Sequence, residues 1–248
     1  MRDETARLRA RYLDLVEDAL INRLYEDAPV IRSWRRSAVF RAADRAIGRD
    51  LPSQAMSMIG KERMRNLRRL AETVIAEGIP GDMIETGVWR GGACICMRAV
   101  LEAWDARDRT VWVADSFRGL PAPDATRYPR DRGDRHHRNT ALAISRAEVE
   151  ENFRRFGLLD GQVRFLEGWF RDTLPSAPIE RLALLRLDGD MYESTMDALT
   201  ALYPRVSPGG VVIVDDYGAV PACRAAVHDF LASRMPGEAV EIERIDWT

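Results

Sequence analysis

The chain has 248 residues, of which 46% are hydrophobic and 31% are charged, and its formal net charge is −2. No apolar stretch approaches the roughly 20 residues that a membrane helix needs, and so small a net charge provides no field that would attract nucleic acid. These properties exclude a membrane-spanning protein, argue against a nucleic-acid partner and fit one large α/β core. Because the first residues are charged and lack the apolar segment of a secretory signal, a cytoplasmic location is expected.

The N-terminal part of the chain is predicted to form a helical extension. Apolar residues recur at helical spacing over residues 5–25, and an arginine-rich segment follows over residues 31–48. The apolar stripe of such a helix must cover either the rest of the domain or a second subunit. We therefore divide the chain into an extension, residues 1–57, for dimerisation or for covering the active site, and a domain, residues 58–248. Simple packing of the extension on the domain is the alternative.

A predicted helix over residues 61–77 leads into the stretch around which the chain is organised, residues 83–92. An apolar strand breaks at Gly87, and Gly91 and Gly92 open a helical pattern. Glycines at such corners let the backbone pass close to a ligand and leave free amides at a helix start, while Glu85 offers a carboxylate. The spacing differs from the dinucleotide fingerprint and is typical of the S-adenosylmethionine turn of methyltransferases. An ordinary turn between strand and helix is the alternative.

The next predicted strand, residues 110–115, ends in Asp115. A carboxylate at this position in a βαβ unit can accept both ribose hydroxyls of a bound nucleoside. Phe117, in the loop that follows, is a candidate for stacking on the purine. This second acidic strand end strengthens the interpretation of the first turn as a cofactor site.

Residues 122–140 are rich in Pro, Asp, Arg and His and show no periodicity. A long loop without secondary structure is usually functional or disordered, and we interpret the wider stretch 118–144 as a lid over the substrate. His136 and His137 within it are candidates for a base or for metal ligands, with two solvated side chains as the alternative.

The rest of the chain alternates strands with helices. Strands are predicted over residues 162–166, 179–188, 211–214 and 240–245, and helices over 145–156, 191–203 and after residue 216. This order indicates an α/β fold, a mostly parallel twisted sheet with helices on both faces. Gly168 and Trp169, directly after the third strand, are expected at the height of the adenine.

Four aspartates end two successive buried strands: Asp188 and Asp190, then Asp215 and Asp216. In doubly wound sheets ligands bind at this carboxyl edge. Without basic partners in the local sequence, such acids would repel one another unless a cation or protonation intervened. Mg²⁺ suits oxygen ligands, so we predict a metal held by Asp188, Asp215 and Asp216, with Asp190 left to accept a proton. Simple capping of strand ends and helices is the alternative.

Together these stretches resemble the macrocin O-methyltransferase family, which methylates sugar or aromatic hydroxyls in antibiotic biosynthesis. The resemblance is carried by Met58-Ile59-Gly60, residues 84–92, Ala114-Asp115-Ser116-Phe117, Asn152-Phe153, Glu167-Gly168-Trp169-Phe170, Leu187-Asp188-Gly189-Asp190 and Asp215-Asp216-Tyr217. It implies a Rossmann-like class I methyltransferase fold and a homodimer or larger homo-oligomer. Family chains continue past Asp246-Trp247 into a closing strand, which this sequence lacks.

The resemblance also implies a role for each matching residue. The residues implied for S-adenosylmethionine are Met58, Ile59, Glu85, Thr86, Gly87, Gly91, Asp115, Ser116, Phe117, Gly168, Trp169 and Asp188. The implied magnesium ligands are Asp188, Asp215 and Asp216, and the implied general base is Asp190.

The predicted function is therefore magnesium-dependent methylation, with S-adenosylmethionine, of a sugar hydroxyl on a nucleotide sugar or a glycosylated natural product. A catechol or phenol O-methyltransferase would use the same acids. A nicotinamide oxidoreductase is disfavoured by the glycine spacing and by the lack of any lysine after Lys61. A scaffold without activity is disfavoured by the intact acids.

Overall fold

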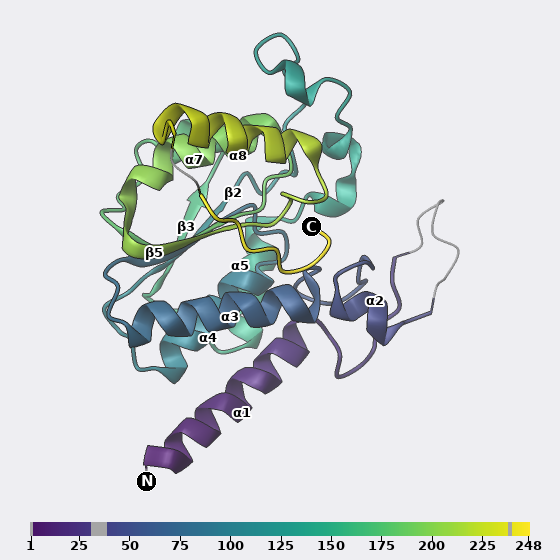
Figure 1. The fold of residues 1–248 in the computed structure, drawn as a ribbon. Helices are drawn as coiled ribbons and strands as arrows, with labels where there is room; N and C mark the ends of the chain where they lie inside the picture. The colour runs from purple at the N-terminus through teal and green to yellow at the C-terminus, as the bar shows by residue number, and fades with distance from the viewer. Residues whose placement is uncertain (1, 31–38, 238–239) are drawn as a thin grey trace.

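Figure 1 shows the computed structural model, which describes residues 2–30, 39–237 and 240–248. Its centre is a five-stranded sheet with the strand order β3-β2-β1-β4-β5, in which every neighbouring pair is parallel. The strands are β1 (Asp82–Thr86), β2 (Val111–Asp115), β3 (Val163–Glu167), β4 (Leu182–Leu187) and β5 (Val206–Val214). The predicted α/β class and parallel sheet are thus confirmed.

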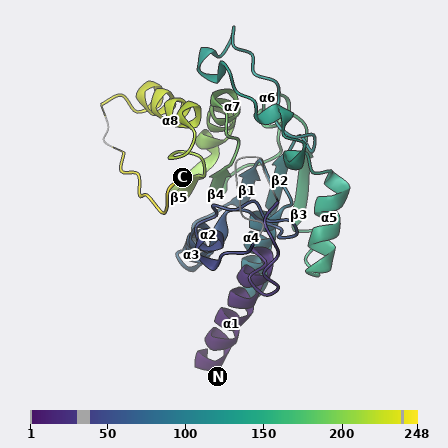
Figure 2. The ribbon, with the colours of Figure 1, turned by 90° about the vertical axis from the view of Figure 1, so that its right-hand side faces the viewer.

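Helices cover both faces of the sheet (Figures 1 and 2). One face carries α3 (Gly60–Ala76), α4 (Gly92–Ala103) and α5 (Arg146–Arg155), and the other carries α6 (Phe170–Thr173), α7 (Tyr192–Leu202) and α8 (Pro221–Arg234). Each strand packs against both helix layers, because successive side chains of a strand point to opposite faces of the sheet. In β2, Val111 and Val113 pack with the first layer, and Trp112 and Ala114 pack with the second.

The strand order reverses between β1 and β4, and this reversal positions the site. The chain builds β1, β2 and β3 outward in one direction, then crosses back to place β4 on the free side of β1 and β5 beyond it. The loops after β1 and β4 therefore leave the sheet on opposite faces and open a crevice between them, which is where such sheets bind ligands.

The N-terminal helix α1 (Arg2–Leu20) packs on the outside of α3 and α4 and points away from the lid (Figures 1 and 2). Leu13, Val16 and Leu20 are buried in the same cluster as the side chains of α3, α4 and β1. Its outer face leaves Leu8 and Leu15 more than half exposed. The short α2 (Ala42–Ala46) follows. The boundary at residue 57 stays a prediction, although the extension and the domain share one core.

Two predicted elements differ from the structure. Residues 240–245 form no strand; instead the C-terminal segment runs across the site, where Asp246 pairs with Arg63 and Trp247 donates to the Ile47 carbonyl oxygen. Tertiary contacts thus outweigh the alternating pattern of that segment. The lid contains three 3₁₀ helices, η1 (Pro129–Asp131), η2 (His136–Arg138) and η3 (Thr140–Leu142), and another, η4 (Tyr203–Arg205), precedes β5.

Part of the arginine-rich segment, residues 31–38, lies outside the described residues. In the described part of the chain, no helix combines the length and apolar character required to cross a membrane.

Candidate active site

The turn after β1 brings two backbones into direct contact. Gly87 has φ +90°, and a Cβ atom there would lie 1.8 Å from the carbonyl oxygen of Asp188. Only glycine fits this close approach in the left-handed region. The turn after β1 and the turn after β4 are thus packed together, so that whatever binds over Gly87 also lies beside Asp188.

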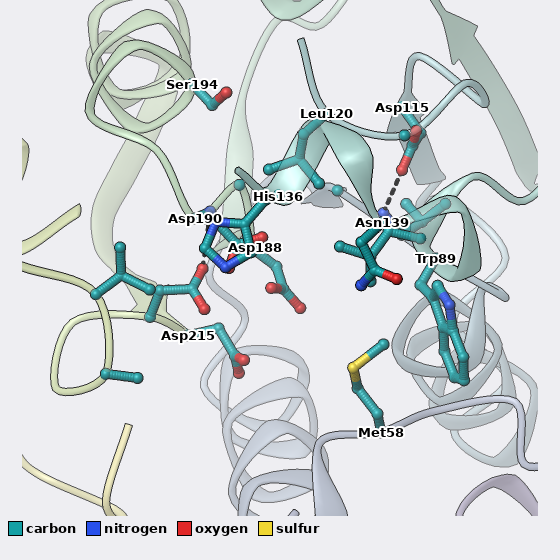
Figure 3. A pocket seen from close by; sticks show the side chains of 18 of the residues that line it. Met58, Trp89, Asp115, Leu120, His136, Asn139, Asp188, Asp190, Ser194 and Asp215 are labelled. Carbon is teal, nitrogen blue, oxygen red and sulfur yellow. Dashed lines mark hydrogen bonds between the residues drawn. The ribbon is translucent and has the colours of Figure 1, made fainter. Parts of the chain in front are cut away.

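Asp115 lies at one end of the crevice, on the opposite side from Asp215 (Figure 3). Its carboxylate accepts from the backbone amides of Val88, at 2.8 Å, and Phe117, at 2.7 Å, and so ties the loop after β2 to the turn after β1. Burial raises the pKa of Asp115, while these two amides act in the opposite direction. The Ser116 hydroxyl lies 3.4 Å from the same Oδ1 that accepts from Phe117, so the Oδ2 atom, which accepts from Val88, is the better candidate for a ligand hydroxyl.

A cavity of about 800 Å³ runs from Asp115 to the four aspartates after β4 and β5. Of the predicted site residues, those that line the cavity are Met58, Ile59, Glu85, Gly87, Asp115, Ser116, Gly168, Trp169, Asp188, Asp190, Asp215 and Asp216. The structure therefore brings most of the predicted set together around one space.

Three predicted cofactor residues lie behind the cavity wall. Thr86 is buried in β1, and Gly91 packs against Val149 at the start of α4. The Phe117 ring is buried against Phe165, with ring centres 6.1 Å apart. The ring thus contributes to the core, and the stacking of Phe117 on a purine stays a prediction.

The acidic group after β4 and β5 has the geometry of a cation site. Asp188, Asp215 and Asp216 each offer one carboxylate oxygen, and these oxygens lie within 4.8 Å of one another. Burial is the main cause that raises the pKa of Asp188 and of Asp216 well above the usual range, and the neighbouring acids raise both further. Three convergent carboxylates with this electrostatic cost fit a hard divalent cation such as Mg²⁺.

The prediction that these acids lack basic partners is wrong. Arg186, fully buried in β4, donates to Asp188 at 2.8 Å, to Asp215 at 2.5 Å and to Glu85. Arg63 from α3 donates to the other oxygen of Asp215 at 2.5 Å. Two guanidinium groups therefore partly relieve the repulsion among the acids, and the argument for a metal depends on the convergence of the oxygens and on the raised pKa values that remain.

Asp190 stands beside this group in a left-handed conformation, with φ 58°. Its amide donates to Asp216 at 3.0 Å, and the residue lines the cavity. Burial raises the pKa of Asp190, and the nearby His136 of the lid opposes that shift. A buried carboxylate with a raised pKa has the properties of a proton acceptor.

The two lid histidines differ in position. His136 lines the cavity near Asp190 (Figure 3), and its Nδ1 lies 2.6 Å from Asp134. His137 is not among the lining residues of the described chain, and the cation group found there consists of aspartates. Neither histidine is therefore placed as a metal ligand.

Prediction from the sequence missed three residues that hold groups at or beside the cavity: Arg186, Arg63 and Asp131. An arginine inside the run Leu182-Ala183-Leu184-Leu185-Arg186-Leu187 was a usable signal, because a charge in a strand buried on both faces requires a partner. Arg63 and Asp131 lie within an ordinary polar helix face and an irregular loop, and their partners are distant in sequence. Nothing local marks them.

Comparison with known proteins places this chain in a family. The family described as "Macrocin-O-methyltransferase (TylF)" matches residues 20–248. The mycinamicin III 3''-O-methyltransferase of Micromonospora griseorubida is 51% identical over 237 residues, covering 94% of this chain and 93% of that protein. The 8-demethyl-8-(2,3-dimethoxy-alpha-L-rhamnosyl)-tetracenomycin-C 4'-O-methyltransferase of Streptomyces olivaceus is 56% identical over 220 residues, covering 88% and 84%.

Among solved structures, the O-methyltransferase NovP superposes with a TM-score of 0.90 at 52% identity and covers 96% of both chains. The predicted resemblance is confirmed by these matches, and so is the fold over nearly the whole chain.

Proposed function

This chain belongs to the macrocin O-methyltransferase family, and from that premise we propose how its site methylates a sugar hydroxyl on a glycosylated natural product. The chain is an O-methyltransferase, as its relatives over most of its length are. The observation that carries the proposal is the single cavity that joins the Gly87 turn and Asp115 to Asp190 and the three convergent aspartates.

S-adenosylmethionine is the proposed methyl donor, and it supplies a methyl group already activated by the sulfonium charge. Glu85, Gly87 and Ser116 line the part of the cavity where it would bind, and the Asp115 carboxylate lines the same part and would accept a ribose hydroxyl. Met58 lies across the cavity from Asp115 (Figure 3) and would cover the nucleoside with an apolar side chain. Glu85 is already paired with Arg186, so we assign it to orienting that arginine and to shaping the wall.

Mg²⁺ is the proposed metal, held by Asp188, Asp215 and Asp216. It would supply positive charge that orients and acidifies neighbouring sugar hydroxyls. Arg186 and Arg63 hydrogen-bond the carboxylate of Asp215 and thereby fix its orientation, as partners of metal-binding carboxylates do.

Asp190 is the proposed general base. A sugar hydroxyl is a poor nucleophile at neutral pH, so the protein must align it and accept its proton. Asp190 takes that proton on its carboxylate, which faces the cavity from a turn fixed by Asp216. Alignment contributes on the order of 7–11 kcal/mol, and a positioned base contributes roughly 10²–10⁴-fold.

The acceptor assignment follows the relatives. Their names specify a 3''-hydroxyl on mycinamicin III and a 4'-hydroxyl on a rhamnosyl tetracenomycin. Two family members thus methylate different hydroxyls of finished glycosides, which favours a glycoside over a nucleotide sugar here. A phenol or catechol acceptor is the competing candidate, because the same acids would bind two neighbouring phenolic oxygens.

The first test is calorimetric titration of S-adenosylhomocysteine and of Mg²⁺ into metal-free protein, with NADH as the control. We expect micromolar binding of the nucleoside, no binding of NADH, and loss of Mg²⁺ binding in Asp215→Ala. No nucleoside binding with or without Mg²⁺ would refute the cofactor assignment.

The second test is a methyl-transfer screen with mycinamicin III as a glycoside and catechol as a phenol. Methylation of catechol alone would favour the phenol alternative. Asp190→Asn should keep S-adenosylhomocysteine affinity but lose at least about 100-fold in kcat. Full turnover of that variant, with methyl transfer shown to limit the rate, would show that another group is the base.

Two further assignments complete the proposal. The exposed apolar residues Leu8, Tyr12 and Leu15 share one side of α1 and would suit contact with a second copy in a homo-oligomer. A cytoplasmic location stays a prediction from the sequence.

A further inference from the structure

Helix α7 begins directly after the Asp190 turn without a cap of its own. Its N-cap residue is Met191, whose side chain makes no capping hydrogen bond. The first amides of a helix have no partner within the helix, and Ser, Thr, Asp or Asn usually supplies one at this position. A methionine there requires the partner to come from elsewhere in the chain.

Asp131 of the lid supplies that partner. Its Oδ1 accepts from the Tyr192 amide at 2.7 Å, and its Oδ2 accepts from the Glu193 amide at 2.9 Å. The residue is 1% exposed, although its neighbours in the sequence, Arg130 and Arg132, are exposed. Negative charge at a helix start is also favoured by the helix dipole. The lid is therefore attached to α7 by a buried carboxylate that uses both of its oxygens.

A second contact supports this attachment. The rings of Tyr128 in the lid and Tyr192 in α7 lie 6.0 Å apart at an angle of 43°. Asp131 is also connected to the next part of the lid, because its carbonyl oxygen accepts a hydrogen bond from the Asp134 amide. Asp134 in turn holds both the amide and the Nδ1 of His136.

The attachment point adjoins the catalytic turn. Asp190 precedes Tyr192 by two residues and adopts the left-handed φ of 58°, which a residue other than glycine keeps only when its surroundings hold it. Asp216 holds this turn from the side of β5, and Asp131 holds it from the side of the lid. His136 then lies over the same turn (Figure 3).

We propose that Asp131 is a positioning residue that attaches the lid to the start of α7 and thereby holds the lid closed and the Asp190 turn in its reactive arrangement. This inference rests on the proposed function only for its catalytic consequence. Opening of the lid would break both hydrogen bonds between the Asp131 carboxylate and the α7 amides. The first turn of α7 would then have no cap. Lid closure and the geometry of the base are in this way coupled through one side chain.

Opening of the lid can be measured by trypsin cleavage. Trypsin cleaves after arginine, and Asp131 is flanked in the sequence by Arg130, Arg132 and Arg135. Asp131→Asn is nearly isosteric but points an amide group at one of the two backbone donors. We expect about tenfold faster cleavage at these arginines, identified by mass spectrometry, with cleavage outside the lid as the internal reference.

Asp124→Asn is the matched control. Asp124 lies in the same lid, but among the described residues its carboxylate accepts only from the neighbouring amides of Thr126 and Arg127. Its cleavage pattern should equal that of the unaltered protein. Equal cleavage of Asp131→Asn and the unaltered protein would overturn the proposal, and so would an equal increase in both variants.

Two further readouts separate positioning from general stability. Asp131→Asn should bind S-adenosylhomocysteine within twofold of the unaltered protein, while kcat with the glycoside methylated in the screen falls about tenfold. An unchanged kcat would refute the coupling to Asp190. Proteolysis needs no methyl transfer, so an inactive parent protein would refute the proposed function and leave the lid result interpretable.

If Asp131→Asn does not fold, hydrogen exchange in the unaltered protein tests whether Asp131 attaches the lid to the start of α7. The Tyr192 and Glu193 amides should exchange at least about tenfold more slowly than the Arg146 and Ala147 amides at the start of α5, where Ser145 caps only Glu148. Equal exchange at the two helix starts would contradict the attachment.

Discussion

Arg186 is the residue on which the electrostatics of the site depend most. It is fully buried and pairs with Glu85, Asp188 and Asp215 at once. Arg186→Gln would leave those acids without their shared counterion, and breaking a buried pair in this way costs about 3–5 kcal/mol. We expect urea unfolding to show a loss of that size.

Arg164→Gln is the control for that measurement, because Arg164 is an exposed arginine in β3 and its removal should change the free energy of unfolding by less than about 0.5 kcal/mol. A loss below about 1 kcal/mol for Arg186→Gln would mean that the acids protonate readily without it.

Asp197 provides a pH-dependent prediction. Burial and the nearby Glu193 raise its pKa to about 6. Because the folded-state pKa exceeds the unfolded value, the folded protein binds the proton more tightly, and stability falls as the pH rises from about 4 to 6. Asp197→Asn removes the free-energy cost of holding a buried negative charge, so it should stabilise the protein by about 1–2 kcal/mol at pH 8. This gain is smaller than the full pKa shift would give, because the side chain is partly solvated.

Thermal unfolding at pH 5 and pH 8 measures that effect, with the exposed Asp108→Asn as the control. The gain should shrink at pH 5. A gain of equal size at both pH values would point to a cause other than titration.

At the residue level, the sequence predicted the proximity of side chains correctly where acidic residues stand at the ends of parallel strands. Asp188, Asp215 and Asp216 end apolar strands, and parallel strands bring their ends to one edge, so their proximity followed from topology. It failed for Arg186 and Asp131, whose partners lie in other elements. Side-chain partners separated by many residues depend on packing that local patterns do not contain.

Among the elements, α1 tests whether the N-terminal extension is an appendage. Leu20 is completely buried in the shared core, whereas Leu15 on the same helix is 58% exposed. Leu20→Ala should therefore cost about 2–5 kcal/mol in the free energy of unfolding. The matched variant Leu15→Ala should cost less than about 0.5 kcal/mol in dilute solution.

Chemical unfolding of both variants at low protein concentration gives the comparison. Similar losses for the two would indicate that the outer face of α1 is also covered, as in an oligomer, and a concentration-dependent midpoint would then identify that oligomer. A small loss for Leu20→Ala would support an extension that packs independently.

Element boundaries show what sequence patterns can and cannot supply. The buried strand after Gly210 was predicted, but β5 begins earlier, at Val206, and includes Pro208. Proline is tolerated because β5 lies at the edge of the sheet, where one side of the strand needs no partner. The opposite error occurred at residues 240–245, where the alternating pattern predicts a strand that the structure lacks. Asp246 pairs with Arg63 of α3 and Trp247 donates to the Ile47 carbonyl oxygen, and these contacts hold the segment away from a strand partner.

For the whole molecule, the site is the point where distant segments meet. Arg63 of α3, Glu85 of β1, Arg186 of β4, Asp215 of β5 and Asp246 of the C-terminal segment form one connected set of ion pairs. A ligand bound beside this set contacts several elements at once. Its binding energy is therefore expected to stabilise the entire fold.

This expectation gives a quantitative prediction for ligand removal. At a concentration of S-adenosylhomocysteine 100 times its Kd, the folded state gains about 2.7 kcal/mol. For a chain of this size each kcal/mol raises Tm by about 2–4 °C, so Tm should rise by about 5–10 °C and return when the ligand is dialysed away. Methionine at the same concentration, which lacks the nucleoside, is the control and should cause no comparable shift.

The shape of the unfolding transition decides whether residues 1–57 belong to the same cooperative unit. Because Leu13, Val16 and Leu20 share a core with α3 and α4, calorimetry should show one transition that shifts as a whole with ligand. An independent extension would instead unfold in a separate transition that the ligand leaves in place. Circular dichroism, which weights the helical signal of α1, should then give a lower midpoint than tryptophan fluorescence, whereas coincident midpoints would establish that the ligand stabilises the extension together with the domain.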